Sequence, residues 1–470
     1  MADICLIYAR STKAVVKALH DVLSKRYSVW WDQDIHAGIF RTEIERELRL
    51  AKCVIPVWSG ASRDNLNVLD EAEYSKGQGV PLLPVRIEPV KFPIGFGGFH
   101  TVDLIDWKGD PEDDRIQTLF HNLENILLAR LTKQNIADKT LALPVFFRSV
   151  SSHETAVQPA AAVSALKLVG CDALLVSAYD IVNEKPEQRS QILADLVSCR
   201  SAGSIVLLDS GNYEASRKKD KTWCAEKLHE ALRITPHDIA LCFDILDPPT
   251  DVEGVVSGIT KSVEEDRKHT SNPVIPIVHA PRNPDGESML EIVPEAIKRV
   301  CDRLRPMAVA IPERELGEGI LNRARTVHEI RRRLNELGFY QPLHLLGTGN
   351  PLSIAVFSAV GADWFDGLEW CRTAADRNTG RLYHLQHYDF FGWQSELAAE
   401  SPIVREAVSS DQIAFAGKVV FHNLDFFAVW MKELRTDLHS GKVERFLTDK
   451  LPLGKESMQL LENAVPEVFG

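Results

Sequence analysis

The sequence has no apolar run long enough to cross a membrane, and its first residues, MADICLIYARSTK, lack the charged-then-apolar order of a secretion signal. It has 8 cysteines but no Cys-x-x-Cys pair and no closely spaced set of cysteines and histidines. Cys5, Cys53 and Cys242 lie inside apolar runs, so we expect reduced, buried thiols. These absences predict a cytoplasmic protein that has no membrane contact, no disulfides and no zinc.

Positive charge is also scarce, because 54 Lys and Arg face 66 Asp and Glu, which gives a formal net charge of -12. By residue count the first 135 residues carry about -2 of this charge and the remainder about -10. Phosphate contacts require the opposite balance, so nucleic acid is an unlikely partner. The one dense basic cluster, Arg331-Arg332-Arg333, falls in a helical pattern and is expected on a solvated helix face.

Five apolar runs near the start of the chain predict buried strands, at residues 3–9, 27–32, 53–59, 80–88 and 101–106. Helical stretches separate them, and this alternation predicts a doubly wound, parallel five-stranded sheet of the α/β class. The common strand order for such a small sheet is 2-1-3-4-5, with a ligand crevice where strands 1 and 3 diverge. Tyr8 and Arg10, at the end of the first strand, and Trp58 and Ser59, at the end of the third, would lie there.

Residues 1–135 resemble a Toll-interleukin receptor (TIR) domain, which has a flavodoxin-like sheet. The resemblance rests on the first strand CLIYAR, the pair Trp31-Asp32 before a loop that ends in Gly38, and the apolar third strand that ends in Ser59. The phrase NVLDEAEYS stands where many TIR domains have Trp-Val, two variable residues and Glu, with Asn67 in place of the tryptophan. In the enzymatic members that glutamate is catalytic, and the resemblance assigns it to Glu71.

The chemistry implied by this resemblance is hydrolysis of the N-glycosidic bond of NAD+, giving nicotinamide and ADP-ribose or a cyclic variant. The leaving group is already cationic, so one carboxylate can suffice to stabilise the oxocarbenium-like ribose. Glu71 is the candidate for this role, whereas Glu73 lies on another helix face and is expected to be solvated. Candidates for stacking on a base, for the diphosphate or for lining the crevice are Tyr8, Arg10, Trp30, Trp31, Phe40, Arg41, Trp58 and Ser59.

A polar segment over about 131–142 follows, with residues 136–142 predicted as a linker. Eight further strand-like runs then alternate with helical stretches, at residues 142–150, 171–179, 203–211, 238–245, 272–280, 307–313, 342–349 and 362–368. Their number and spacing predict a (β/α)8 TIM barrel over 143–385, followed by a helical part over 386–470. Chemistry in such barrels lies at the carboxyl ends of the strands, where five polar residues fall: Asp209, Asp244, His279, Glu313 and Asp366.

These strand ends resemble tRNA-guanine transglycosylase. VLLDSGNYEA is similar to that family's Asp-Ser-Gly-Gly-Phe-Gln, ALCFDILDPP to its Phe-Asp-Glu strand and RELGEG to its Val-Gly-Glu-Gly, and the residues from 343 to 383 match most strongly. The resemblance implies that Asp366 is the nucleophile that attacks ribose, Asp209 its acid/base partner and Asp244 a carboxylate that recognises the base.

The sequence departs from that family at three places. Of the family's zinc site, which has three cysteines and a histidine, only His422 remains, and no cysteine follows Cys371. The glutamine that reads the base is replaced by Val278 or His279, and the Gly-Gly of the sixth strand by Pro312-Glu313. We therefore expect a barrel that keeps a nucleoside-sized pocket with altered selectivity.

Both resemblances concern bonds between ribose and a nitrogenous base. The first hypothesis is a regulated NAD+ hydrolase of bacterial antiphage defence that self-associates through its TIR domain. Its barrel would sense a nucleoside or a deazaguanine-like ligand. The alternative is a base-exchange enzyme that acts on a nucleic acid or a nucleoside and uses the TIR domain only for assembly. A purely structural interaction protein is disfavoured, because carboxylates persist at both predicted sites.

Overall fold

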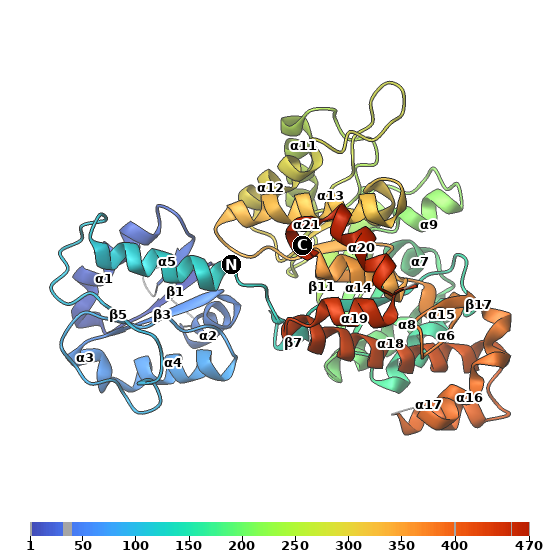
Figure 1. Cartoon of the computed structure of the whole chain (residues 1–470), viewed down its shortest axis with the longest axis horizontal. Helices are drawn as coiled ribbons and strands as arrows, with labels where there is room; N and C mark the ends of the chain where they lie inside the picture. The colour runs from blue at the N-terminus through green and yellow to red at the C-terminus, as the bar shows by residue number, and fades with distance from the viewer. Residues whose placement is uncertain (1, 32–39, 399–400, 453, 470) are drawn as a thin grey trace. The chain divides into compact units, whose positions relative to one another are not determined.

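The computed structural model describes residues 2–31, 40–398, 401–452 and 454–469 (Figure 1). These residues form two compact units. The first comprises the residues up to Arg130 together with Asn335–Tyr340, and the second comprises Leu131–Leu334 and Gln341 onward.

The first unit contains the five-stranded parallel sheet that the sequence predicts. Its strands β1 to β5 pair in the order β2-β1-β3-β4-β5, which confirms the predicted order. The fourth strand is shorter than its apolar run at 80–88, because Pro81 and Pro84 have no N–H to donate to a neighbouring strand. Leu82 still forms a bridge to Val54. The strands are β1 (Ile4–Ile7), β2 (Val29–Trp30), β3 (Cys53–Trp58), β4 (Val85–Arg86) and β5 (Val102–Asp103).

Helices α2 and α4 of this unit share a hydrophobic core with β1 and β3. Leu48 contributes from α2, and Val68 and Ala72 contribute from α4. The side chain of Asn65 begins α4 by accepting hydrogen bonds from two backbone N–H groups of the first turn. The helices are η1 (Arg10–Thr12), α1 (Lys13–Leu23), α2 (Phe40–Leu50), α3 (Gly60–Arg63), α4 (Leu66–Gly77) and α5 (Asp114–Leu128).

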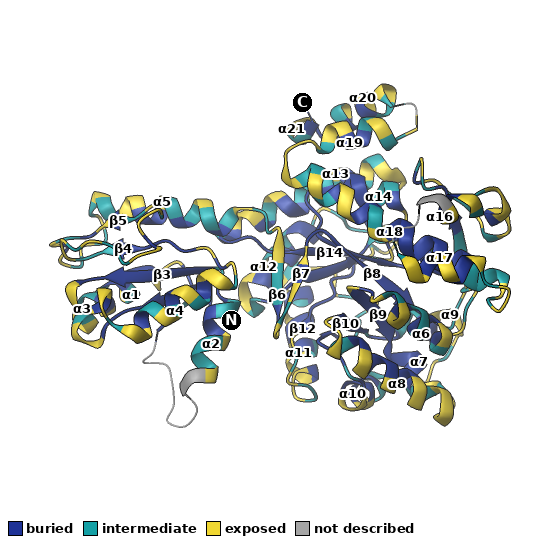
Figure 2. Cartoon of the chain, turned by 90° about the horizontal axis from the view of Figure 1, so that it is seen from below, coloured by how far each residue is buried: buried dark blue, intermediate teal, exposed yellow. Residues whose placement is uncertain are grey.

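The second unit contains the predicted barrel of eight parallel strands. The strand order is β12-β11-β10-β9-β8-β15-β14-β13, and a bridge between Ile277 and Ala310 links the two ends. Figure 2 shows the strands buried inside helices whose outer faces are exposed. The strands are β8 (Val145–Val150), β9 (Ala173–Ser177), β10 (Ile205–Asp209), β11 (Ile239–Leu241), β12 (Val274–Ile275), β13 (Val309–Pro312), β14 (Leu343–Leu346) and β15 (Trp364–Gly367).

Long helices connect successive strands, and short helices follow several of the strands directly. The long helices are α6 (Pro159–Val169), α8 (Pro186–Ser201), α10 (Ala225–Ile234), α11 (Val252–Asp266), α12 (Val293–Leu304), α13 (Gly319–Leu334) and α14 (Pro351–Ala359). One short helix, η4 (Asn335–Leu337), follows α13 and groups with the first unit. The short helices that follow strands are α7 (Ala178–Asn183), α9 (Asn212–Arg217), η3 (Glu313–Glu315) and α15 (Glu369–Arg372). The short helices place polar side chains at the carboxyl ends of the strands.

The segment expected to be a linker forms an antiparallel hairpin of β6 (Lys133–Ile136) and β7 (Lys139–Ala142). Its polar side chains bind groups at the amino ends of the barrel strands. The ammonium group of Lys139 donates to both carboxylate oxygens of Asp238 at 3.0 Å, and the Gln134 amide donates to the Met307 carbonyl at 2.8 Å. Part of the segment predicted as a linker, residues 139–142, thus forms a strand, and its polarity reflects hydrogen bonds to the barrel.

Helix α13 corrects the interpretation of the basic cluster. Arg331 is buried and binds Asp363 at 2.9 Å, and it also donates to the Gly361 and Gln341 carbonyls. Arg332 alone is fully exposed, and it pairs with Glu329 on the helix surface. The cluster is therefore only partly a solvated face, because one arginine lies in the core of the barrel unit.

The chain after the barrel is mainly helical, and α18 (Phe415–His439) is its central element. Phe427 of this helix contacts Phe146 of β8, with ring centres 4.6 Å apart. The other elements are β16 (Thr373–Ala375), β17 (Leu382–His384), η5 (Leu385–Phe390), α16 (Gly392–Ala398), α17 (Pro402–Ser409), α19 (Val443–Lys450), α20 (Lys455–Ala464) and α21 (Pro466–Phe469). Within the residues that the structure describes, no helix combines the length and the apolar character needed to span a membrane.

Candidate functional site

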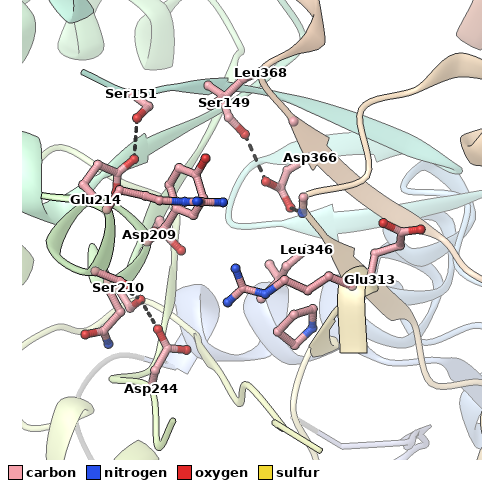
Figure 3. A pocket seen from close by; sticks show the side chains of 18 of the residues that line it. Ser149, Ser151, Asp209, Ser210, Glu214, Asp244, Glu313, Leu346, Asp366 and Leu368 are labelled. Carbon is pink, nitrogen blue, oxygen red and sulfur yellow. Dashed lines mark hydrogen bonds between the residues drawn. The ribbon is translucent and has the colours of Figure 1, made fainter. Parts of the chain in front are cut away.

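A cavity of about 510 Å³ opens at the carboxyl ends of the barrel strands. All five residues that the sequence places at strand ends line it: Asp209, Asp244, His279, Glu313 and Asp366. Figure 3 shows the carboxyl groups of Asp209, Asp244 and Asp366 around one shared space. The structure therefore brings together residues that are more than 150 positions apart in the chain, and the cavity volume suits a nucleoside-sized ligand.

Asp366, at the end of β15, is held by three hydrogen-bond donors. Its Oδ1 accepts from His344 Nε2 at 3.0 Å and from the Gly347 N–H at 3.1 Å, and its Oδ2 accepts from Ser149 Oγ at 3.0 Å. These donors come from β14, the loop after it and β8. They fix the orientation of the carboxylate, as a nucleophile that must approach one carbon atom requires.

Asp209, at the end of β10, lies in a different electrostatic environment. Burial, together with the nearby charges of Glu214 and Asp244, raises the pKa of Asp209 well above its usual range. A carboxyl group that keeps its proton near neutral pH can act as a general acid. Asp209 and Asp366 thus differ in environment, because other carboxyl groups surround the first and three hydrogen-bond donors hold the second.

Asp244 and His279 form a charged network with Glu315 of η3. His279 Nε2 lies 3.1 Å from Asp244 Oδ1, and its Nδ1 lies 2.9 Å from Glu315 Oε1. Burial alone would lower the pKa of His279, but the hydrogen bonds to the two carboxylates outweigh it and raise the pKa to about 9. Val278 is fully buried and does not line the cavity, so His279 is the residue that faces the ligand space.

Glu214 of α9 belongs to the cavity and was not among the predicted site residues. It is 3% exposed and accepts hydrogen bonds from Ser151 Oγ at 2.5 Å and Ser177 Oγ at 2.6 Å. Burial and the charge of Asp180 raise its pKa to about 7. A signal was present in the sequence, since the run DSGNYEA has Glu214 where the family it resembles has glutamine. Glu315, also missed, lies in the run RELGEG.

One wall of the cavity is formed by backbone in close contact. A methyl group added to Gly367 would lie 2.6 Å from the Gly349 Cα atom, and one added to Gly349 would lie 1.7 Å from Glu369 Oε2. Neither glycine can therefore be replaced without moving the ends of β14 and β15 or the Glu369 side chain.

His422, which the resemblance aligns with a zinc ligand, is a buried residue of α18. Its Nε2 donates to the Ala375 carbonyl at 2.7 Å, and its Nδ1 accepts from Ser395 Oγ. Burial lowers its pKa to about 4. Both ring nitrogens are thus occupied by protein groups. Among the described residues no group of three His, Cys, Asp or Glu side chains is arranged to hold a metal ion.

In the first unit, Tyr8 and Trp31 lie side by side beyond the ends of β1 and β2. Their ring centres are 6.0 Å apart, and Trp31 also stacks on His20 at 4.8 Å. Arg10 is exposed in η1, close along the chain to Tyr8. Trp30 is half-buried and packs against the core that α2 and α4 share with β1 and β3.

Two candidates at the end of β3 are interior residues. Trp58 is fully buried and contacts Phe96, with ring centres 5.4 Å apart. Ser59 is also fully buried, and its hydroxyl and backbone N–H form the capping box of α3 with Ser62. This burial contradicts the expected substrate contacts of both residues, because Trp58 packs in the core of the unit and the Ser59 hydroxyl and N–H are used within the cap of α3.

Glu71 lies on α4 and is partly buried, and its backbone carbonyl accepts from Ser75 Oγ at 2.8 Å. Glu73 lies on the exposed face of the same helix and pairs with Lys76 at 3.4 Å, as expected of a solvated residue. The loop 34–38 and the side chains of Phe40 and Arg41 fall outside the described part of the chain.

Comparison with known proteins covers both units. Residues 4–120 match the family model of the TIR domain. The remainder is similar to proteins named tRNA-guanine(15) transglycosylase. The protein from Pyrococcus furiosus is 22% identical over 272 residues, which is 55% of this chain and 44% of that protein. The one from Haloarcula marismortui is 25% identical over 253 residues, 51% of this chain and 48% of that protein.

This chain spans about half the length of the curated relatives that it matches. The fold and the matches together define its class: the chain joins a TIR domain to a transglycosylase-like barrel. The resemblance seen in the sequence is thereby confirmed for both parts.

Proposed function

We propose that this protein is an NAD+ hydrolase in which the transglycosylase-like barrel binds a nucleoside or base and regulates the TIR domain. The match of residues 4–120 to the TIR family carries this proposal. It is supported by the partly buried position of Glu71 on α4 and by the exposed position of Arg10 after β1.

In the proposed reaction, the bond between ribose and the pyridinium nitrogen breaks and the electron pair leaves with nicotinamide. The Glu71 carboxylate stabilises the positive charge that develops on the ribose. Water or an adenine nitrogen then forms the new bond, which gives ADP-ribose or its cyclic variant. Arg10, which is exposed, is the candidate contact for the diphosphate, whereas Tyr8 and Trp31 are buried and pack against each other.

The barrel supplies the control in this proposal. An unrestrained NAD+ hydrolase would poison its own cell, so the enzyme needs an off state. Bacterial antiphage defence is the setting that such an arrangement suits, with self-association of TIR domains as the active state. A barrel ligand shifts this equilibrium only if it binds the active state better than the inactive one.

The test is to incubate the full-length protein with NAD+ and to measure nicotinamide release by chromatography, over a range of protein concentrations. Glu71→Gln should lower the turnover at least about a hundredfold, because one electrostatic stabiliser is lost while the helix tolerates glutamine. Glu73→Gln is the matched control on the same helix, and it should keep wild-type turnover. Full turnover by the Glu71→Gln variant, or no nicotinamide from the wild type at any concentration, would refute the proposal.

A second candidate function is base exchange within the barrel. It is favoured by the three donors that fix Asp366 and by the raised pKa of Asp209 in the same cavity. The test is incorporation of labelled guanine into RNA or a nucleoside. Exchange without nicotinamide release would support this candidate and leave the TIR domain as an assembly module.

A further inference from the structure

His279 is enclosed by two carboxylates that come from different strands of the barrel. Asp244 follows β11 and contacts the Nε2 side of the ring at 3.1 Å, and Glu315 of η3 contacts the Nδ1 side at 2.9 Å. The second oxygen of Glu315 accepts from the Ala280 N–H at 2.9 Å. Glu315 is therefore anchored to the backbone beside the residue that it holds.

These contacts determine the protonation of the ring. A neutral imidazole has a single N–H, so one of its nitrogens would direct a lone pair at a carboxylate oxygen. The imidazolium form donates to both carboxylates, and the network Asp244–His279–Glu315 then carries one net negative charge. Asp244 and Glu315 are the charged groups that act on this ring.

We propose that His279 and Glu315 are positioning residues, which hold Asp244 so that its carboxylate accepts two adjacent N–H groups from the base of a bound nucleoside. This inference rests on the proposed function of the barrel as a nucleoside-binding domain. Base recognition by Asp244 is already implied by the family resemblance, and what is new is that His279 and Glu315 hold its carboxylate.

The hydrogen-bond inventory of Asp244 supports the proposal. Its Oδ1 accepts from His279 and its Oδ2 accepts from Ser210 Oγ at 2.7 Å. Each carboxylate oxygen can accept a second hydrogen bond, so two acceptor positions remain side by side. Both N–H groups of His279 are already used. The ring therefore offers no donor to the ligand, and a ligand acceptor placed beside it would lose its hydrogen bond.

Guanosine and inosine test this preference. Guanosine presents a ring N–H next to an amino group, whereas inosine lacks the amino group. Titration calorimetry with the full-length protein should show guanosine binding about tenfold or more tightly than inosine, because one hydrogen bond to a charged acceptor is lost. His279→Ala should abolish this preference, since Asp244 and Glu315 would repel each other and move apart.

Glu315→Gln gives a readout that a merely structural role would not move. With one carboxylate removed, the imidazolium of His279 should lose its proton at a lower pH. Guanosine affinity of this variant should fall relative to wild type as the pH rises from 6.5 to 8.0. Comparing the variant with the wild type at each pH removes the effect of other groups that titrate in this range. Glu318→Gln, an exposed residue of the same loop, is the matched control and should follow the wild type.

The outcomes separate this inference from the function on which it rests. If wild type binds both nucleosides equally, or if the Glu315→Gln variant keeps the wild-type pH profile, the positioning role is wrong while the barrel remains a nucleoside-binding domain. If neither nucleoside binds, both the inference and the proposed role of the barrel fail.

Discussion

Replacing Glu214 by glutamine should make the protein more stable at alkaline pH and change little at acidic pH. Glu214 is almost completely buried, and burial together with the charge of Asp180 raises its pKa from 4.5 to about 7. Glutamine has nearly the same shape, and the hydroxyl groups of Ser151 and Ser177 can rotate to serve its amide. The variant removes the charge and keeps the packing.

The magnitude follows from the two pKa values. Below pH 4.5 the carboxyl is protonated in both the folded and the unfolded state. Between pH 4.5 and about 7 the unfolded state loses its proton first, so the free energy of unfolding falls as the pH rises. At about 1.4 kcal/mol per pH unit, the full effect is about 3 kcal/mol above pH 7. This contribution is present at low pH and lost at high pH.

Urea unfolding at pH 5, 6, 7 and 8, followed by circular dichroism, measures this effect. The difference in the free energy of unfolding between Glu214→Gln and wild type should grow by about 2 kcal/mol or more from pH 5 to pH 8. Glu187→Gln changes an exposed carboxylate on α8 and should show no such growth. A constant difference between Glu214→Gln and wild type at all four pH values would show that Glu214 has an ordinary pKa and that the reasoning is wrong.

Two further predictions concern the frame of the barrel. Arg331→Met should lower the free energy of unfolding by about 3–5 kcal/mol, because it leaves Asp363 buried without its partner, whereas Arg332→Met on the surface should cost less than about 1 kcal/mol. Urea titrations of both variants provide the comparison. Gly211→Ala should cost about 3 kcal/mol or prevent folding, since its φ is 83° and the new methyl group would lie 2.5 Å from a backbone nitrogen. Gly170→Ala has a similar φ of 65° and nothing within 4 Å, so thermal unfolding should show a cost of only about 1 kcal/mol.

The sequence predicted the architecture well, because a buried parallel strand leaves a nearly continuous apolar run. All five strands of the first sheet and all eight of the barrel fall inside the predicted runs. The strand ends also identified Asp209, Asp244 and Asp366 as neighbours, since a barrel brings the carboxyl ends of its strands to one face. Strand pattern and sheet topology were therefore enough to predict both the positions of the strands and the grouping of these three aspartates.

The burial of individual side chains, and the residues with which they pair, could not be predicted in the same way. Arg331 and Arg332 are adjacent and identical in type, yet only Arg331 lies in the core. Its partner Asp363 is distant in sequence, so the sequence could not show which of the two arginines is buried. Trp58 was assigned to the crevice because it ends a strand, but β3 is buried along its whole length and Trp58 packs in the core against Phe96. Glu315 was recognised as a residue of the site only from its contact with His279, because sequence spacing does not reveal this pairing.

The close contact between Gly349 and Gly367 restricts which residues around the cavity can be substituted. A side chain added at either glycine would have to displace the backbone of the other or the Glu369 side chain, so this wall tolerates little change. New ligand preferences must therefore arise across the cavity, on the loops after β10, β12 and β13. The departures Glu214, His279 and Glu313 all lie there. If the barrel binds a nucleoside as proposed, its base preference can change on these loops while Asp366 stays in place.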